Sequence, residues 1–532
     1  MPIPKPIRNS LKPYEEFPLQ DYLTNTANRL PDKIAIIDED RKFTFKEISE
    51  TSDRLASGLV ELNVQKGDRI GLLSPNCAEF AIAFFGILKA GATVSTINSG
   101  YREREIAHQL NNSGAQILIV HHSLVPMAEA ARNDIPALQK LLVITEDPKE
   151  ELSFWKIIKT APAGMPMVSI NCKSDLAALP YSSGTTGLPK GVMLTHHNLT
   201  SNVKQCFQRP GEAATCTEQD VILDFLPLFH IYGMTILMAQ AIAVGATQVM
   251  MGRFNMETFL SLISEHRVTG LYAVPPVGLN LIQYPNLSNY DLSSLRWIVF
   301  GAAPMSTDTQ KRISKVLNVP VAQAYGLTET SPLTNHDYID ANKARPGSIG
   351  PASADTETKV VDLSDGESEL PFGEIGELLV RGPQVMKGYF RNEEATAETI
   401  TSDGWLHTGD MVQMDEDGYV WIMDRKKELI KYKGFQVPPA ELEGLLLEHP
   451  AVSDAAVIGK ENLESGEIPK AFIVKTTAHD TNEEELMAFV ASKVATFKHV
   501  REIEFVESIP KNPSGKILRR ILVEQERSKN TT

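Results

Sequence analysis

The fold and chemistry are decided by YSSGTTGLPKGVMLTHHN, residues 181–198, where an apolar strand runs into small and hydroxylated residues before a second strand. Its glycines permit close backbone approach, and its hydroxyls and backbone N–H groups can surround an oxyanion. The residues that form this cradle are Ser182, Ser183, Gly184, Thr185, Thr186, Gly187 and Lys190, the last of which adds a positive charge.

Two other interpretations of this stretch are weaker. It lacks the G-x-x-x-x-G-K-[ST] spacing of the P-loop NTPases. The alternative is a flexible Gly/Ser linker with no binding role, but linkers rarely lie between two apolar strands. The composition therefore favours a phosphate-binding loop.

Outward from the loop, helix-like and strand-like patterns alternate along most of the chain. Residues 45–62 have helical periodicity, 69–74 and 115–120 are short apolar runs, and 81–97 is an apolar helix that ends near Gly91 and continues into a strand. The same alternation continues to about residue 350, after which residues 355–424 form short alternating strands. We expect a layered α/β body followed by a β-rich section.

The Lys-rich stretch DRKKELIKYKGFQVPPAE, residues 424–441, is typical of an exposed connector. The residues beyond it alternate between helix and strand patterns over a length that can fold alone. We therefore predict a large N-terminal domain over residues 1–424 and a small, mobile α+β domain over residues 425–532. The fold class is α/β, with layered α/β subdomains and a β-rich subdomain in the large domain.

Composition excludes several classes of protein. The 532 residues carry 52 Lys and Arg against 67 Asp and Glu, a net charge of −15, which disfavours a general nucleic-acid binder. The cysteines form no C-x-x-C pair, so neither a zinc site nor a disulfide framework is indicated. No apolar run reaches about 18 residues, and neither a signal peptide nor a peroxisomal tripeptide is seen. We expect a cytoplasmic protein without a transmembrane segment, as a monomer or homodimer.

The stretch at 181–198 resembles the phosphate-binding signature of the adenylate-forming superfamily, which includes acyl-CoA synthetases, luciferases and peptide-synthetase adenylation domains. Five further segments of that superfamily follow in the expected order: LPLFHIYG (226–233), AYGLTET (324–330), GWLHTGD (404–410), DRKKELIKYKGFQVPPAELE (424–443) and PKNPSGKILRR (510–520). Local spacing is most similar to the 4-coumarate:CoA ligase-like branch and its fatty acyl relatives.

This resemblance implies an AMP-forming acid–thiol ligase that uses ATP, Mg²⁺ and coenzyme A. A carboxylate would attack the α-phosphorus of ATP to give an acyl-adenylate and pyrophosphate. The thiol of coenzyme A would then displace AMP. Because both reactants of the first step are anions, the protein must supply positive charge in the transition state.

By the same resemblance, one set of residues would bind the nucleotide. Tyr325 would stack on adenine, Asp410 and Arg425 would hold the ribose and α-phosphate, and Glu329 would bind Mg²⁺. Without the resemblance, Tyr325 would be an ordinary core aromatic and Asp410 with Arg425 a surface ion pair. The same region of the site would include Thr328, Ala302, Ala303, Pro304 and Gly326.

A second set would act on the acyl group and coenzyme A. The resemblance places His230 and Lys516 at the reacting carboxylate, although a lone His is more often a core residue and a lone Lys an ordinary helix start. Lys427 would be the hinge about which the small domain rotates. Lys431 and Gln436 would face the nucleotide during adenylation, Lys433 and Gly434 would border the pantetheine channel, and Arg253 would contact the phosphates of coenzyme A. A solvated linker face is the alternative for the Lys-rich segment.

The acyl pocket would be lined by Tyr232, Ile236, Val299, Ala324, Pro332 and Leu333, together with Ala302. Phenolic-acid ligases of this branch tend to place Lys at the position of Val299 and Ser at that of Ile236. Because a buried phenol without a partner loses roughly 1 to 3 kcal/mol, we expect a medium or long fatty acid, or an apolar aryl acid. The alternatives are a 4-coumarate-type phenylpropanoid ligase, an enzyme that loads a carrier protein in trans, and a catalytically silent nucleotide sensor.

Overall fold

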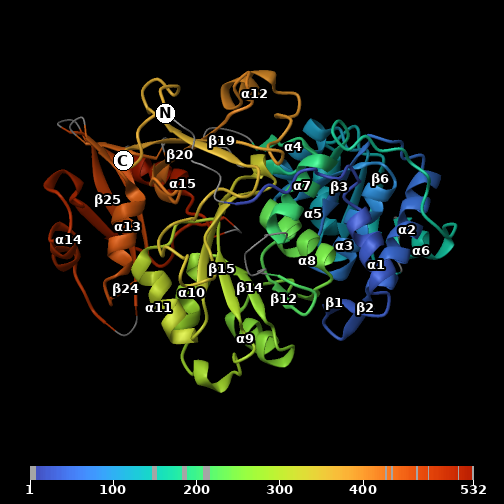
Figure 1. Ribbon diagram of the computed structural model, residues 1–532, viewed down its shortest axis with the longest axis horizontal. Helices are drawn as coiled ribbons and strands as arrows, with labels where there is room; N and C mark the ends of the chain where they lie inside the picture. The colour runs from blue at the N-terminus through green and yellow to red at the C-terminus, as the bar shows by residue number, and fades with distance from the viewer. Residues whose placement is uncertain are drawn as a thin grey trace.

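The computed structural model shows two large sheets with helices around them, a smaller β-rich section, and a separate C-terminal unit (Figure 1). The structure describes residues 8–146, 152–182, 189–207, 216–425, 428–432, 435–462, 465–476, 479–512 and 515–529. This arrangement confirms the predicted α/β fold with a large N-terminal and a smaller C-terminal part.

The first large sheet has seven strands in the order β11-β8-β4-β3-β5-β6-β7, and its central strands are parallel. Those central strands are almost wholly buried, as strands covered by helices on both faces must be. The strands are β3 (Arg69–Leu73), β4 (Thr93–Ile97), β5 (Ile117–His121), β6 (Lys140–Ile144), β7 (Leu152–Ser153), β8 (Leu176–Ala178) and β11 (Leu194–Thr195).

The second large sheet has eight strands in the order β17-β16-β15-β14-β12-β13-β1-β2. Its inner strands are parallel, and the edge strands β2 and β17 run antiparallel to their neighbours. The strands are β1 (Ile34–Asp38), β2 (Arg41–Thr44), β12 (Val221–Asp224), β13 (Thr247–Met250), β14 (Gly270–Ala273), β15 (Trp297–Phe300), β16 (Val321–Gly326) and β17 (Leu333–His336).

The helix α3 (Ala78–Lys89) lies between the two sheets and is buried along its whole length. Its Lys89 ammonium lies 2.6 Å from Asp53 and donates to the carbonyl of Ser49, so the buried charge is paired. The helix confirms the apolar helix expected from the sequence. No helix among the described residues is both long and apolar enough to cross a membrane.

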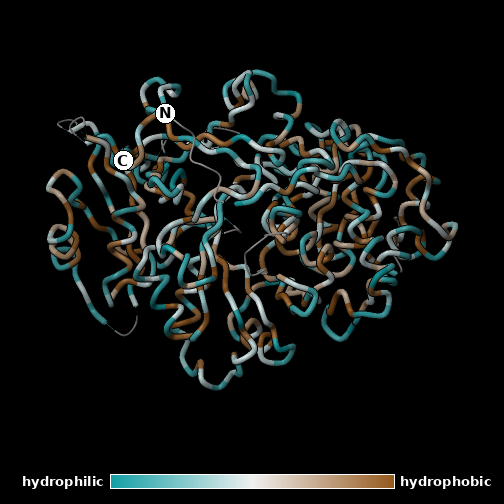
Figure 2. Tube along the Cα trace, viewed as in Figure 1, coloured by the Kyte–Doolittle hydropathy of each residue, from teal (hydrophilic) through white to brown (hydrophobic). Residues whose placement is uncertain are grey.

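Other helices cover the outer faces and the sheet ends. A capping box between Thr44 and Glu47 fixes the start of α2. The helices are α1 (Asp21–Arg29), α2 (Phe45–Glu61), α4 (Glu103–Ser113), η1 (His122–Leu124), α5 (Val125–Arg132), α6 (Phe154–Thr160), α7 (His196–Phe207), η2 (Tyr232–Ala239), α8 (Gln240–Val244), α9 (Met256–Glu265), α10 (Pro275–Ile282), η3 (Leu287–Asn289), α11 (Thr307–Leu317) and η4 (Thr328–Thr330). One apolar core joins both sheets, and Figure 2 shows the apolar stretches concentrated along the inner strands and helices.

The predicted β-rich section is an antiparallel sheet of four strands, which confirms the expected change of architecture. The strands are β18 (Glu357–Val361), β19 (Ile375–Arg381), β20 (Leu406–Met414) and β21 (Val420–Arg425), and α12 (Glu393–Thr399) lies between β19 and β20 in the chain. The register places Asp410 opposite Arg425. Two residues from different motifs are thereby brought together.

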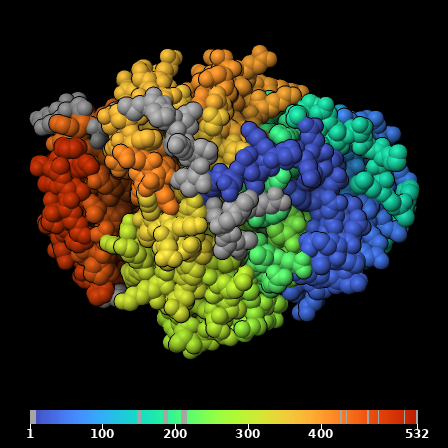
Figure 3. All heavy atoms as spheres, in the orientation of Figure 1, coloured from blue at the N-terminus to red at the C-terminus, as the bar shows by residue number. Residues whose placement is uncertain are grey.

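The C-terminal unit has its own five-stranded sheet and its own core. Arg519 forms ion pairs with Glu428 and Glu443, and Asp424 accepts a hydrogen bond of 2.8 Å from the backbone N–H of Ala440. Figure 3 shows this unit packed against the β-rich section. Its elements are β22 (Ile430–Tyr432), β23 (Phe435–Val437), α13 (Pro439–Leu447), β24 (Val452–Asn462), β25 (Gly466–Lys475), α14 (Glu483–Ala491), η5 (Thr496–Lys498), β26 (Glu502–Phe505) and α15 (Arg519–Lys529).

Candidate active site

A cavity of about 2120 Å³ lies where the large α/β body, the β-rich section and the C-terminal unit meet. It is lined by residues from every segment that the sequence analysis singled out. The predicted site residues on its wall are Ser182, Lys190, His230, Tyr232, Ile236, Val299, Ala302, Ala324, Tyr325, Gly326, Thr328, Glu329, Pro332, Leu333, Arg425 and Lys516.

The predicted phosphate loop begins and ends in a small hairpin on the cavity wall. Strand β9 (Tyr181–Ser182) pairs antiparallel with β10 (Lys190–Gly191), which places Ser182 opposite Lys190. The predicted binding residues Ser183, Gly184, Thr185, Thr186 and Gly187 lie outside the described residues. The Lys190 ammonium lies 4.8 Å from the ring centroid of Tyr389, so the cation rests on an aromatic face.

Asp410 links two of the predicted nucleotide residues. The Tyr325 hydroxyl donates to one of its carboxylate oxygens, and Arg425 Nε lies 2.7 Å from the other. Asp410 is 3% exposed, and its charge raises the pKa of the Arg425 guanidinium. Tyr325 and Arg425 line the cavity while Asp410 lies behind them, so the carboxylate holds both groups in position.

A short turn after β16 carries Thr328 and Glu329 into the cavity. At Gly326 a Cβ atom would lie 2.0 Å from the carbonyl oxygen of Pro332, so the close approach of β16 and β17 requires glycine there. The Glu329 carboxylate accepts a hydrogen bond of 2.9 Å from the Tyr389 hydroxyl. Tyr389 therefore contacts both Lys190 and Glu329, and no sequence motif pointed to it.

Glu329 fits the predicted magnesium site. Among the described residues no three His, Cys, Asp or Glu side chains are grouped as ligands of one metal ion. Mg²⁺ in nucleotide enzymes is usually held by one or two carboxylates together with phosphates and water, so a single oriented carboxylate is a suitable donor.

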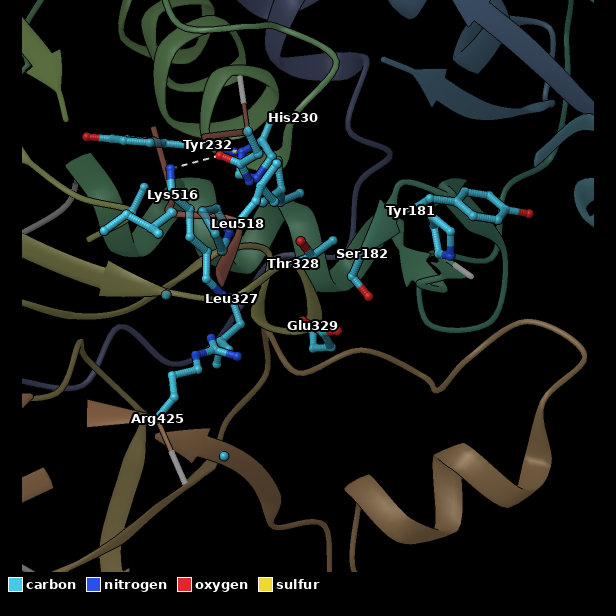
Figure 4. A pocket seen from close by; sticks show the side chains of 18 of the residues that line it. Tyr181, Ser182, His230, Tyr232, Leu327, Thr328, Glu329, Arg425, Lys516 and Leu518 are labelled. Atoms are coloured by element: carbon cyan, nitrogen blue, oxygen red, sulfur yellow. Dashed lines mark hydrogen bonds between the residues drawn. The ribbon is translucent and has the colours of Figure 1, made fainter. Parts of the chain in front are cut away.

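Lys516, from the C-terminal unit, lies at the same end of the cavity as His230 and Tyr232 (Figure 4). Burial, and to a smaller extent the positive charge of Lys516, lower the pKa of His230 to about 4. Burial and the charge of Arg425 also lower the pKa of the Lys516 ammonium. His230 is therefore neutral near pH 7, which leaves Lys516 as the cation of this pair.

One wall at this end of the cavity is built by a π-helix, η2, which the sequence patterns did not predict. At its start a Cβ atom on Gly233 would lie 2.2 Å from the carbonyl oxygen of Pro227, so glycine permits this packing. The buried Tyr232 hydroxyl contacts the carbonyls of Ala273 and Val299 at 3.4 and 3.3 Å. Figure 4 shows Tyr232 projecting beside Lys516. The predicted pocket residues Ile236, Val299, Ala324, Pro332 and Leu333 complete this apolar wall.

Several predicted residues are not brought into the cavity. Ala303, Pro304 and Arg253 are absent from its wall, and Arg253 is exposed between β13 and α9. Lys431 is exposed in β22, opposite Gln436 in β23. Lys427, Lys433 and Gly434 lie outside the described residues. Sequence reasoning also missed Gln240 and Tyr272, two polar residues of the cavity wall.

Comparison with known proteins gives one consistent result. A family model described as AMP-binding enzyme matches residues 23–390, and a model of the AMP-binding enzyme C-terminal domain matches residues 441–516. The 4-coumarate–CoA ligase of Pinus taeda is 41% identical over 96% of this chain and 95% of its own length.

Solved structures agree with the sequence matches. The crystal structure of the anthranilate CoA ligase AuaEII in complex with anthranoyl-AMP superimposes with a TM-score of 0.90 at 30% identity, over 97% of this chain and 98% of that one. A benzoate CoA ligase from Burkholderia xenovorans LB400 superimposes with a TM-score of 0.86 at 26% identity, over 96% and 100%.

Proposed function

Since the chain belongs to the AMP-binding enzyme family and is an AMP-forming acid–thiol ligase that uses ATP, Mg²⁺ and coenzyme A, we propose that it activates an aryl acid of the hydroxycinnamate type. The observation that carries this choice is the similarity over 96% of the chain to a 4-coumarate–CoA ligase. The aryl acids named for the two structural neighbours point the same way. The proposal takes up the 4-coumarate-type alternative in place of the fatty acid or apolar aryl acid that Ile236 and Val299 favoured.

In the first half-reaction, the chain must bring two anions together. We assign the phosphates to the loop that ends at Lys190, the adenine and ribose to Tyr325, Asp410 and Arg425, and the magnesium ion to Glu329. Bound Mg²⁺ would neutralise charge on the phosphates. Tyr389 would position both the cation and the carboxylate, because it contacts Lys190 and Glu329.

Lys516 would act at the reacting centre. Its ammonium comes from the C-terminal unit into the cavity and is partly buried, and a positive charge shielded from water stabilises developing negative charge better than one in bulk water. Neutral His230 would orient the substrate carboxylate without adding a competing charge. Thr328 would donate its hydroxyl to the α-phosphate, from the turn that carries Glu329.

In the second half-reaction, the sulfur of coenzyme A must reach the carbonyl that Lys516 covers. We propose that the C-terminal unit, residues 425–532, rotates about Lys427 and withdraws Lys516. The exposed position of Arg253 suits contact with the phosphates of coenzyme A. In the second arrangement Lys433 and Gly434 would border the pantetheine channel, as predicted from the resemblance. Lys431 and Gln436 keep their predicted roles at the nucleotide during adenylation, although Lys431 is exposed in the present arrangement. The cytoplasmic location and the oligomeric state stay predictions.

The test is a panel of carboxylic acids incubated with ATP and Mg²⁺, with and without coenzyme A, in which AMP and thioester are measured. We expect AMP and thioester in equal amounts, with hydroxycinnamates turned over faster than medium or long fatty acids. Faster turnover of fatty acids would overturn the aryl-acid proposal. Turnover indifferent to coenzyme A would instead indicate loading of a carrier protein, and nucleotide binding without turnover would indicate a sensor.

A further inference from the structure

The acyl end of the cavity contains a buried amide that has spare hydrogen-bonding capacity. Gln240, the first residue of α8, directly follows the π-helix and is 0% exposed. The Tyr272 hydroxyl donates a hydrogen bond of 3.1 Å to Gln240 Oε1, which fixes the amide. Gln240 Nε2 has no hydrogen-bond partner among the described residues, although both side chains line the cavity.

The strand next to the one that carries Tyr272 holds a buried carboxyl group, which does not itself line the cavity. Ile222 of β12 pairs with Gly270 of β14, so two residues further along Asp224 lies beside Tyr272 on the same face of the sheet. Asp224 is 0% exposed, and neither carboxyl oxygen has a hydrogen-bond partner among the described residues. Burial raises its pKa well above the usual value of a carboxyl group.

The position of these groups points to the substrate. Tyr272 pairs with Val299 across β14 and β15, and Val299 forms part of the apolar wall. The amide therefore lies among the residues that would enclose the acyl group, on the large body and away from Lys190 and Glu329. Buried polar atoms in proteins are almost always paired, because an unpaired one costs stability. The unpaired amide donor of Gln240 is complementary to a hydroxyl group, whose oxygen accepts hydrogen bonds.

We propose that Gln240, oriented by Tyr272, determines specificity by donating a hydrogen bond to a hydroxyl group at the distal end of the acyl substrate. This inference rests on the proposed aryl-acid function and deepens it. It also answers the objection that Ile236 and Val299 leave a ring hydroxyl without a polar partner, because the partner comes from α8 instead.

The test compares 4-hydroxycinnamate with cinnamate as substrates for the full-length enzyme and for Gln240→Leu. We expect the wild-type ratio of kcat/KM to favour the hydroxylated acid by at least about tenfold, because a site built to hydrogen-bond a hydroxyl rejects the analogue without it. In Gln240→Leu the ratio should fall to about one. Tyr272→Phe keeps the ring but frees the amide to rotate, and it should lower the ratio by a smaller factor.

Gln248→Leu is the matched control. Gln248 in β13 is also 0% exposed with unpartnered amide atoms, but it does not line the cavity. Its replacement should leave the ratio unchanged. The inference is overturned if Gln240→Leu keeps the wild-type ratio, if Gln248→Leu lowers it equally, or if wild type does not distinguish the two acids. Should Gln240→Leu fail to fold, Tyr272→Phe decides by the same ratio. If wild type turns over neither acid, the proposed function itself fails.

Discussion

At the proposed nucleotide end of the cavity Asp410, Arg425 and Glu329 each have a hydrogen-bonded or charged partner in the protein, whereas at the proposed acyl end Gln240 Nε2 has no hydrogen-bond partner among the described residues. The first arrangement is preorganised before any ligand binds, so little reorganisation is needed during reaction. The second leaves its hydrogen bonds to be completed by the substrate. Under the proposed function, this contrast separates residues that would take part in the chemistry from a residue that would select the acid.

The largest expected effect is at the junction of the two ends. Lys516→Ala should slow adenylate formation from ATP by at least about 10²- to 10³-fold, since losing one such electrostatic contact raises a barrier by roughly 3 to 4 kcal/mol. Conversion of a supplied acyl-adenylate to thioester should remain, because the proposed rotation of the C-terminal unit would withdraw Lys516 for that step. Single-turnover assays of each half-reaction measure both. An equal loss in the two half-reactions would contradict the rotating-unit mechanism.

Replacing Asp410, at the preorganised end, should reduce activity by a smaller factor than replacing Lys516. Asp410→Asn removes the charge that Arg425 and Tyr325 share, and we expect kcat/KM for ATP to fall about ten- to hundredfold, the range for losing a charged hydrogen bond. The matched control is Asp417→Asn, which removes an exposed partner of Arg345 in the turn between β20 and β21. That surface pair should have little effect on activity. Comparable losses in both variants would refute the special role of Asp410.

The lowered pKa of His230 gives a prediction for stability against pH. The folded value is about 4, below the ordinary 6.5, so between these values the unfolded chain binds a proton that the folded chain does not. The free energy of unfolding therefore falls as pH falls from about 6.5 to about 4. His230→Gln should remove about 3 kcal/mol of that loss, since each unit of pKa shift corresponds to roughly 1.4 kcal/mol.

Urea unfolding of wild type and His230→Gln at several pH values measures this difference. His196, whose pKa burial also lowers to about 4, contributes to the slope in both proteins and cancels in the comparison. Identical slopes for the two proteins would show that His230 is not held neutral by its surroundings.

The smallest expected effect is at the apolar wall. Ile236→Ala enlarges the acyl end without changing any charge, so cinnamic acids with a ring methoxy group should gain about tenfold in kcat/KM relative to unsubstituted cinnamate. Ile242→Ala is the control, because Ile242 is equally buried but does not line the cavity. It should lower stability without changing this ratio. A similar shift in selectivity from both variants would mean that Ile236 does not touch the acid.

The difference between the two ends also explains how far the sequence could be interpreted. Lys190, Glu329, Asp410 and Lys516 lie in short motifs whose spacing and charge are visible along the chain, and the structure brings the described ones to one cavity or directly behind its wall. The parallel strands and the buried helix α3 were also predicted, since continuous apolar runs identify elements covered on both faces. Tyr389 was missed because its two contacts lie in other segments of the chain.

By itself, the sequence determined the α/β fold class, the charged chemistry and the family resemblance, because strand and helix periodicity and the grouping of charged residues are local properties of the chain. The tertiary structure decided the composition of the acyl end. Gln240 and Tyr272 come from a helix and a strand that lie next to each other only after folding. The proposed role of these residues depends on their burial and on the hydrogen-bond partner of each polar atom. Neither can be known from an extended chain.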